Sequence, residues 1–188
     1  MGILNITPDS FYDGSSLSNK NSLNYKISRI ESSDIIDIGA ESSRPGSKPI
    51  TISKEIDRLK MINIKKIKSN FISIDSYKYE VIDYALNNGC NMINDITAGG
   101  INYKNIELAI KFNVPIILMH MQGNPESMQI NPKYDNLIDN ILSFFDSKIN
   151  YSIKMGLKKE QIILDPGVGF GKSVEDNYMI IKSLDKIK

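Results

Sequence analysis

The sequence predicts an α/β protein built on a parallel sheet, and two observations support this fold class. Short apolar runs alternate six times with segments of helical periodicity along the 188 residues, as in proteins whose parallel strands are joined by right-handed crossovers. Each apolar run also delivers a polar residue at its carboxyl end, as in 162–165 (Ile-Ile-Leu-Asp) and 72–75 (Ile-Ser-Ile-Asp). Buried parallel strands have this pattern, and such folds place their chemistry where the strands end.

The expected strands are continuous apolar runs bounded by turn residues. The first strand starts with the sequence, and Pro8 ends it because proline lacks a backbone donor and restricts the residue before it. Pro115 opens the fifth strand, a position at which strands tolerate proline. The expected ranges are 2–6, 34–39, 71–75, 92–95, 116–119 and 162–165.

Helices are expected between the strands wherever apolar residues recur every three or four positions. One of them stops at Gly89 and the longest closes at Gly156, because glycine is a usual helix end. Ser173 is expected to cap the last one. The apolar positions are Leu23, Ile27 and Ile30; Ile52, Ile56 and Leu59; Val81, Ile82, Ala85 and Leu86; Ile106, Ala109 and Ile110; Ile138, Ile141, Leu142, Phe145, Ile149 and Ile153; and Ile181, Leu184 and Ile187.

Two long connections follow the first and second strands, at 7–19 and 40–50. Both are polar and contain proline and glycine. We expect them to be the most mobile internal segments in the absence of ligand.

The composition bounds the class of protein. A content of 41% hydrophobic and 24% charged residues is typical of one soluble globular domain, and a net charge of +1 gives no electrostatic reason to bind nucleic acid or a membrane. The single cysteine, Cys90, excludes an internal disulfide and indicates a reducing compartment. No run is long enough to span a bilayer and no signal peptide is visible, so we expect a cytoplasmic protein.

The strand–helix alternation fits both a doubly wound open sheet and a closed barrel. Polar residues end all six strands, whereas a doubly wound fold gathers its site near one switch point, so the barrel is favoured. A complete (β/α)8 barrel has eight units and about 250 residues. We therefore expect an incomplete (β/α)8 TIM barrel with six of its eight βα units, forming one domain over residues 1–188.

The stretch after the sixth strand contains two motif-like patterns that fail. Residues 171–173 (Gly-Lys-Ser) resemble the end of a phosphate-binding loop, but that motif needs a glycine where Pro166 stands. The glycines at 167, 169 and 171 also lack the spacing of a dinucleotide-binding loop. We interpret this stretch as a tight turn between a strand and a helix.

The polar residues at the strand ends are the candidate site. Each one alone would be read as the cap of the following helix, but in one barrel they converge on a single mouth. Two carboxylates and an amide can hydrogen-bond the donor-rich edge of a flat heterocycle, while Asn5 can ligate a hard cation and Arg44 can hold an anion. The only histidine is expected to line the pocket and not to bind a metal. The strand-end residues are Asn5, Asp37, Asp75, Asn94, His120 and Asp165, and the expected pocket-lining residues are Asp37, Met119, His120 and Phe170.

Six stretches of the sequence, in order and with family spacing, resemble dihydropteroate synthase. The resemblance covers nearly the whole chain, and Thr-Pro-Asp-Ser-Phe and Met-His-Met-Gln-Gly-Asn-Pro are its most specific parts. The stretches are Met-Gly-Ile-Leu-Asn-Ile-Thr-Pro-Asp-Ser-Phe at 1–11, Asp-Ile-Gly-Ala-Glu-Ser-Ser-Arg-Pro-Gly at 37–46, Ser-Ile-Asp-Ser at 73–76, Ile-Asn-Asp-Ile at 93–96, Leu-Met-His-Met-Gln-Gly-Asn-Pro at 118–125 and Leu-Asp-Pro-Gly-Val-Gly-Phe-Gly-Lys at 164–172.

The resemblance implies a transferase of folate biosynthesis. It would condense 6-hydroxymethyl-7,8-dihydropterin diphosphate with p-aminobenzoate, giving 7,8-dihydropteroate and diphosphate. Asn5 matches the residue associated with Mg²⁺ and the diphosphate, and Ser43 and Arg44 match loop residues near the diphosphate and p-aminobenzoate. A homodimer and inhibition by sulfonamides are also implied. The residues that match the pterin contacts are Asp75, Asn94 and Asp165.

The sequence departs from the family pattern at one loop residue and, more seriously, at its carboxyl end. Ser43 stands where threonine is usual, which keeps the hydroxyl, so we expect little effect. The chain ends after the sixth helix, so the family's seventh-strand lysine and eighth-strand Arg-x-His pair are not in it. We therefore expect a truncated domain, and we expect residues 1–188 by themselves to be poorly soluble and inactive.

Two other interpretations stay open at this point. The chain could be the pterin-binding domain of a corrinoid methyltransferase, a related barrel, although the two diagnostic loops favour the synthase. It could also be a catalytically dead remnant that at most binds pterin.

Overall fold

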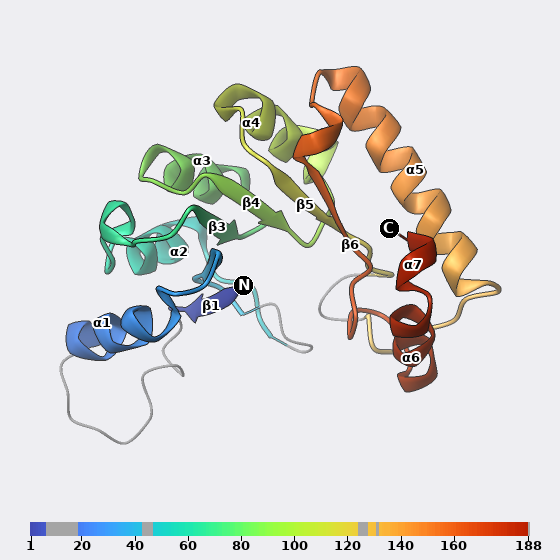
Figure 1. The fold of residues 1–188 in the computed structure, drawn as a ribbon, viewed down its shortest axis with the longest axis horizontal. Helices are drawn as coiled ribbons and strands as arrows, with labels where there is room; N and C mark the ends of the chain where they lie inside the picture. The colour runs from blue at the N-terminus through green and yellow to red at the C-terminus, as the bar shows by residue number, and fades with distance from the viewer. Residues whose placement is uncertain (7–18, 43–46, 124–127, 131, 188) are drawn as a thin grey trace.

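The chain forms a six-stranded, entirely parallel sheet with helices along it (Figure 1). The computed structural model describes residues 1–6, 19–42, 47–123, 128–130 and 132–187. Strands pair in sequence order, each with the next, and all six lie where the sequence predicts them. They are β1 (Gly2–Asn5), β2 (Ile35–Gly39), β3 (Phe71–Asp75), β4 (Met92–Asp95), β5 (Ile116–Met119) and β6 (Ile162–Asp165).

A helix follows every strand, and several helices begin at the caps that their sequences provide. The Thr51 and Asn136 side chains accept hydrogen bonds from backbone N–H groups of their helices, and Ser173 forms a capping box with Asp176, as expected. The helices are α1 (Asn19–Ile30), α2 (Ile52–Leu59), α3 (Tyr79–Asn87), α4 (Lys104–Phe112), α5 (Leu137–Met155), α6 (Val174–Lys182) and α7 (Leu184–Ile187), with short 3-10 turns η2 (Ile64–Lys66), η3 (Ile101–Tyr103) and η4 (Lys159–Gln161).

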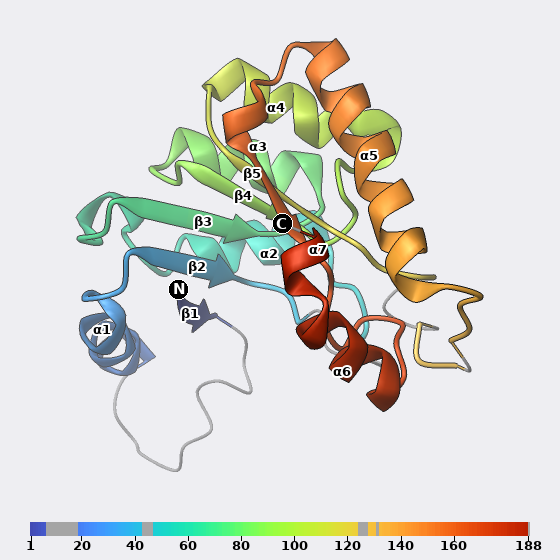
Figure 2. The ribbon, with the colours of Figure 1, turned by 45° about the vertical axis from the view of Figure 1, so that its right-hand side comes forward.

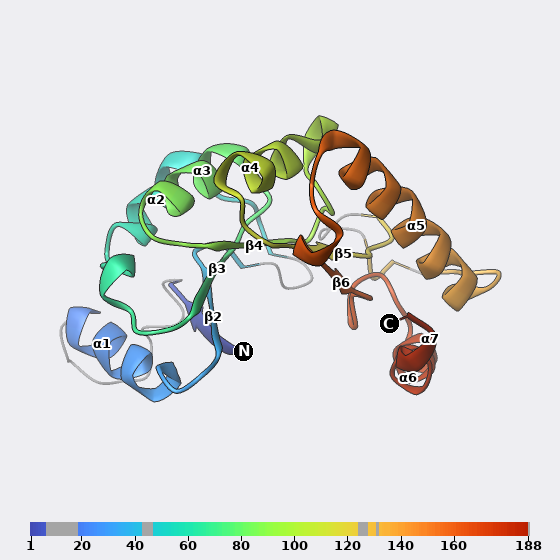
Figure 3. The same cartoon turned by 45° about the horizontal axis from the view of Figure 1, so that its top comes forward.

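The sheet and its helices curve into an arc (Figure 3). Helices α2 to α5 lie along the outer side, the strands lie inside them, and β1 and β6 stand at the two ends of the strand order. This is the arrangement of consecutive units of a (β/α)8 barrel, with six units present. The predicted fold class is therefore confirmed.

The hydrophobic core lies between the strands and the outer helices. Alternate strand residues such as Ile36, Ile74 and Ile93 are fully buried there, because successive side chains of a strand point to opposite faces. Burying each such side chain stabilises the fold by about 1.5–3 kcal/mol. The opposite alternation places a second set of side chains on the inner face of the arc, and these are mostly polar at the carboxyl ends of the strands.

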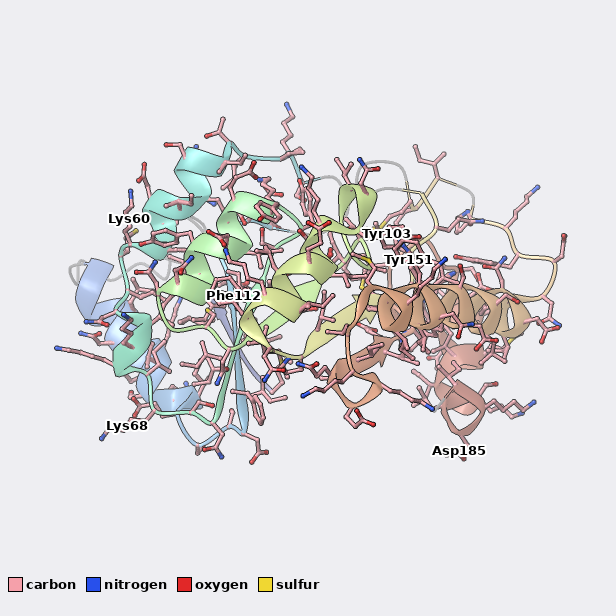
Figure 4. All side chains as sticks on the ribbon, turned by 90° about the horizontal axis from the view of Figure 1, so that it is seen from above. Lys60, Lys68, Tyr103, Phe112, Tyr151 and Asp185 are labelled. Carbon is pink, nitrogen blue, oxygen red and sulfur yellow. The ribbon has the colours of Figure 1, made fainter. Side chains whose placement is uncertain are left out.

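Aromatic contacts join neighbouring outer elements as well. The ring of Tyr103 in η3 stacks on Tyr151 of α5, with centroids 3.9 Å apart and planes inclined by 25° (Figure 4). The ammonium of Lys148 lies 4.6 Å from the Tyr103 centroid, a cation–π arrangement that adds to this contact. These residues fix the amino-terminal side of α4 against the long helix α5.

The end of the chain differs from the sequence prediction. One helix through Ile181, Leu184 and Ile187 was expected, but α6 ends at Lys182, and the φ of −110° and ψ of 13° at the next residue, Ser183, are not helical. Ile180 is the buried residue of α6, whereas Ile181 and Leu184 are 56% and 47% exposed. The prediction of one continuous apolar stripe was wrong because the break after Lys182 changes the direction of the helix.

Two further observations complete the fold. Cys90 is a buried, free thiol, and its burial raises its pKa to about 12, so it is a packing residue and no activated nucleophile. Among the helices that the structure describes, none combines the length and the apolarity needed to cross a membrane.

Candidate active site

The strand register brings the polar strand-end residues to one face and one edge of the sheet. Asn5, Gly39, Asp75 and Asn94 are paired in sequence from β1 to β4, so they stand at one level. Paired residues of parallel strands project to the same face. Figure 2 shows that the strands run in a common direction, so their carboxyl ends meet at one edge of the arc.

Gly39 creates the space in which Asn5 and Asp75 approach each other. A methyl group at Gly39 would lie 3.2 Å from Asn5 Oδ1 and 3.2 Å from Asp75 Oδ2. These distances are tighter than ordinary van der Waals contact. The absence of a side chain at Gly39 therefore lets an amide oxygen from β1 and a carboxylate oxygen from β3 flank the same position.

Asn94 forms a hydrogen bond with Asp37, which lies two residues before Gly39 on the same strand. The Asn94 amide donates from Nδ2 to Asp37 Oδ2 over 3.1 Å. Asp37 is buried, and its Oδ1 has no hydrogen-bond partner among the described residues. Burial raises the pKa of Asp37, while Ser73 and Asn94 act in the opposite direction. A buried acceptor without a donor is costly, so the site is prepared for a ligand that donates hydrogen bonds.

Asp75 has the most strongly altered titration of the inner face. Burial raises its pKa to about 8, and the negative charges of Asp37, Glu55, Asp95 and Glu41 act in the same direction. At neutral pH the free protein therefore holds a proton on this carboxyl group. Protonated, the group is both a donor and an acceptor.

The turn after β6 holds Asp165 in place. Asp165 Oδ1 accepts a hydrogen bond from the Gly167 N–H over 2.8 Å. Gly167 has a φ of +69°, and a side chain there would lie 2.0 Å from the His120 carbonyl oxygen, so only glycine fits. Asp165 is paired with Met119 of β5, which puts both side chains on the inner face.

The buried side chain of Lys172 also stabilises this turn. Its side chain is buried, and Nζ donates to the carbonyl oxygens of Phe170, over 2.9 Å, and His120, over 3.1 Å. Burial lowers the pKa of Lys172 to about 8, against the opposing charges of Asp165 and Asp176. The ammonium therefore connects the end of β5 to the glycine-rich turn that carries Asp165.

His120 lies on the other face of the sheet. It follows Met119 directly, so strand alternation turns its ring toward α5, where Nε2 is 3.3 Å from Asn140 Oδ1 and the ring meets Phe144 edge-on at 5.0 Å between centroids. Burial lowers the pKa of His120 to about 4, so the ring is neutral at pH 7. The ring therefore packs between β5 and α5, whereas the sequence analysis expected it to line the pocket.

The remaining predicted residues divide into two groups. Met119 is buried on the inner face, and Phe170 is half-buried in the turn after β6. Ser43 and Arg44 lie outside the described residues. The structure adds Ser73, a fully buried hydroxyl on the inner face beside Asp37, which the sequence analysis missed. Its signal was its position two residues before Asp75 in an otherwise apolar run.

Comparison with known proteins identifies the family. The family profile described as Pterin binding enzyme matches residues 1–188. The dihydropteroate synthase of Clostridium beijerinckii is 41% identical over 196 residues, covering 100% of this chain and 69% of the relative. That of Haemophilus influenzae is 38% identical over 192 residues, covering 99% and 69%. This chain belongs to the dihydropteroate synthase family.

Solved dihydropteroate synthase structures agree with this assignment. The Yersinia pestis enzyme with a sulfonamide drug complex has a TM-score of 0.88 and 36% identity, covering 100% of this chain and 69% of that one. The Xanthomonas albilineans enzyme with 4-aminobenzoic acid has a TM-score of 0.86 and 31% identity, covering 100% and 67%. The expected family, its transferase class and its place in folate biosynthesis are confirmed, and these relatives favour the synthase over the methyltransferase domain.

Proposed function

We propose that the inner face of this chain binds the dihydropterin substrate of dihydropteroate synthesis through Asp75, Asn94 and Asp165. The observation that supports this most directly is the pair of buried polar atoms Asp37 Oδ1 and Ser73 Oγ, neither of which has a hydrogen-bond partner among the described residues. A pterin ring has ring N–H and amino groups along one edge. Such donors match a face that is rich in carboxylate oxygens.

The electrostatics of the face suit a neutral, donor-rich heterocycle. Each buried acceptor left unpaired costs about 1–3 kcal/mol, and a ligand donor recovers that free energy on binding. The protonated Asp75 keeps the cluster from holding several adjacent negative charges. The Gly167 N–H holds the Asp165 side chain in place, so the side chain loses little conformational entropy when a ligand binds.

The reaction that follows is a substitution at the carbon attached to the pterin ring. The C–O bond to the diphosphate breaks, and the diphosphate leaves with the electron pair. The p-aminobenzoate nitrogen forms the new C–N bond and gives up one proton to solvent. In this scheme the residues of the inner face hold and orient the ring, and a rate gain from orientation alone is substantial.

Mg²⁺ is the cofactor that we propose for the leaving diphosphate. Mg²⁺ takes only one or two oxygen ligands from the protein and fills its shell with water and substrate phosphate. Asn5 Oδ1, at the gap above Gly39, is an oxygen that could serve as one of them. The donor set therefore fits a shared site, in which the ion would neutralise charge on the diphosphate.

The second substrate would approach from the β2–α2 connection. Ser43 and Arg44, which lie outside the described residues, are proposed to contact the diphosphate and p-aminobenzoate, because a guanidinium pairs well with either anion. Relatives have been solved with 4-aminobenzoic acid and with a sulfonamide drug complex. We accordingly propose that sulfonamides inhibit this protein in competition with p-aminobenzoate.

Two properties of the assembled protein belong to the same proposal. We infer a cytoplasmic location from the single, buried thiol and a homodimeric state from the family resemblance. Sedimentation of the protein as its gene encodes it would test the dimer.

Calorimetry tests the pterin site. Asp165→Ala in the protein as its gene encodes it should abolish measurable binding of a pterin diphosphate, whereas Asp83→Ala, on the outer face of α3, should bind as wild type does. Both variants should keep the wild-type unfolding temperature to within a few degrees, about the effect of 1 kcal/mol. Unchanged pterin affinity in Asp165→Ala would remove this residue from the site.

A further inference from the structure

Lys78 lies at the centre of a buried ionic cluster beside the candidate site. Its Nζ contacts Glu41 Oε2 at 2.6 Å and Glu55 Oε2 at 2.8 Å. The side chains of Lys78, Glu41 and Glu55 are only 12%, 10% and 1% exposed. Burial would lower the pKa of Lys78, but Glu41 and Glu55 outweigh it and the pKa is raised, so the lysine is charged at neutral pH.

The first half of the cluster closes the β2–α2 connection. Lys78 Nζ donates to the Ile50 carbonyl over 2.7 Å, and the Ile50 N–H donates to Glu41 Oε2 over 2.7 Å. Lys78, Glu41 and Ile50 therefore form a ring of three contacts. Glu41 follows β2 closely and Ile50 precedes the cap of α2, so one ammonium holds both ends of the connection.

A second contact narrows the connection further. The Ser47 hydroxyl donates to the Ser42 carbonyl over 2.6 Å, directly on either side of residues 43–46. We call residues 41–42 and 47–50 the loop neck. The expected mobility of 40–50 stays a prediction, and these contacts join the two described ends of that segment.

The other half of the cluster connects the loop neck to the strand that carries Asp75. Glu55 of α2 accepts from Lys78 and, at Oε1, from the Ser76 hydroxyl over 2.8 Å. Ser76 directly follows Asp75, and its hydroxyl also accepts from the Lys78 N–H over 3.3 Å. The cluster therefore ties the loop neck, α2 and the carboxyl end of β3 into one unit.

We propose that Lys78 is a positioning residue that holds the loop neck closed against the end of β3. It touches no substrate in this scheme. Lys78 lies three residues after Asp75, so its contacts with Glu41 and Ile50 fix the described ends of the connection relative to the end of β3 without the help of Glu55. This inference rests on the proposed function for its effect on turnover, since it assigns p-aminobenzoate capture to the loop that the neck supports.

Two variants break the ring of contacts among Lys78, Glu41 and Ile50, and one variant leaves these contacts in place. Lys78→Met removes the ammonium, and Glu41→Gln weakens the ring should Lys78→Met fail to fold. Glu55→Gln keeps the Lys78–Glu41–Ile50 ring, although it changes the most buried member of the cluster. Lys111→Met is the matched control, because it removes an exposed lysine ion pair with Asp83 away from the loop neck.

Amide exchange and kinetics are the two readouts, measured on the protein as its gene encodes it. In Lys78→Met and Glu41→Gln we expect exchange of the Ile50 amide to accelerate about tenfold or more, because its acceptor is no longer held. We expect the KM for p-aminobenzoate to rise about tenfold, with kcat within about threefold and pterin affinity unchanged, because only orientation is lost. Glu55→Gln and Lys111→Met should keep the wild-type Ile50 exchange and KM.

Each alternative outcome has a clear meaning. Wild-type exchange and KM in both Lys78→Met and Glu41→Gln would overturn the inference, as would an equal rise of KM in Glu55→Gln, which would indicate a purely stabilising cluster. A wild-type protein that forms no dihydropteroate would contradict the proposed function instead. The Ile50 exchange would still decide whether Lys78 holds the loop neck.

Discussion

Asn94 of β4 donates a hydrogen bond to Asp37 of β2 across the intervening strand β3. The two residues are 57 positions apart in sequence, yet their side chains meet over 3.1 Å on the inner face of the arc. One amide thus joins alternate strands, while Asp37 Oδ1 and the Ser73 hydroxyl have no hydrogen-bond partner among the described residues. The site that we propose for the pterin therefore depends on three neighbouring strands, β2, β3 and β4.

Removing that amide should weaken pterin binding. Asn94→Ala removes the amide that we propose to contact the pterin, and a ligand group left without that partner costs about 1–3 kcal/mol, or roughly a tenfold to hundredfold higher Kd for a pterin ligand. Calorimetry checks this, with Asn87→Ala as control because Asn87 is exposed and bonds only to Asp83 on its own helix. Equal affinities in the two variants would show that Asn94 does not serve the site.

The raised pKa of Asp75 should make stability depend on pH. Its pKa rises from 3.8 to about 8 on folding. Between those values the folded protein keeps a proton that the unfolded chain has lost, so stability is full at low pH and falls as pH rises, by at most about 1.4 kcal/mol per unit. Urea denaturation at pH 5 and 7.5 should show a smaller loss for Asp75→Asn than for wild type. Identical losses would mean that Asp75 titrates normally.

A methyl group at Gly39 should impair the site while the fold survives. The Gly39 backbone lies outside the left-handed region, so alanine is allowed there, but its Cβ would press on Asn5 Oδ1 and Asp75 Oδ2. We expect Gly39→Ala to fold and to bind a pterin diphosphate roughly tenfold more weakly, because both oxygens must shift.

Gly156→Ala is the complementary control for that substitution. Gly156 ends α5 with a φ of +110° and open space around it, so alanine strains the backbone there without touching the site. It should lower the unfolding temperature and leave binding unchanged. The prediction for Gly39 fails if calorimetry shows that Gly39→Ala binds as tightly as Gly156→Ala.

Lys172→Met should loosen the turn that carries Asp165. It leaves the buried His120 and Phe170 carbonyls without their donor, at a cost of about 1–3 kcal/mol in the free energy of unfolding. We also expect weaker pterin binding, because Asp165 is held by that turn. Lys182→Met, at an exposed position of α6, should change neither quantity. Wild-type affinity for the pterin in Lys172→Met would show that the contacts of Lys172 are not needed for pterin binding.

The sequence was informative about strands and their polar ends because both are local patterns. Continuous apolar runs located all six strands, and Asp75, Asn94 and Asp165 stand on the expected face. The direction of the His120 ring was not predictable, because a shift of one residue moves a strand side chain to the opposite face. The ring faces α5, and periodicity alone does not say where the inner side begins.

The Lys78 cluster was missed for a different reason. Lys78 and Glu41 are 37 positions apart, and Lys78 and Glu55 are 23 apart, so no local pattern links them. In sequence each one reads as an ordinary surface charge of a loop or a helix start. Only the packing of α2 beside α3 turns them into a buried group.

The strand order of the sheet also bears on how the chain is made. Every strand pairs with the one synthesised just before it, so each strand–helix unit can dock as soon as it leaves the ribosome. Loops that close over a short stretch of sequence lose little entropy, and the pairs among the six described strands all join neighbours in sequence. The sheet can therefore form strand by strand from β1 to β6 during translation. The Asp37–Asn94 hydrogen bond can form once β4 has been added.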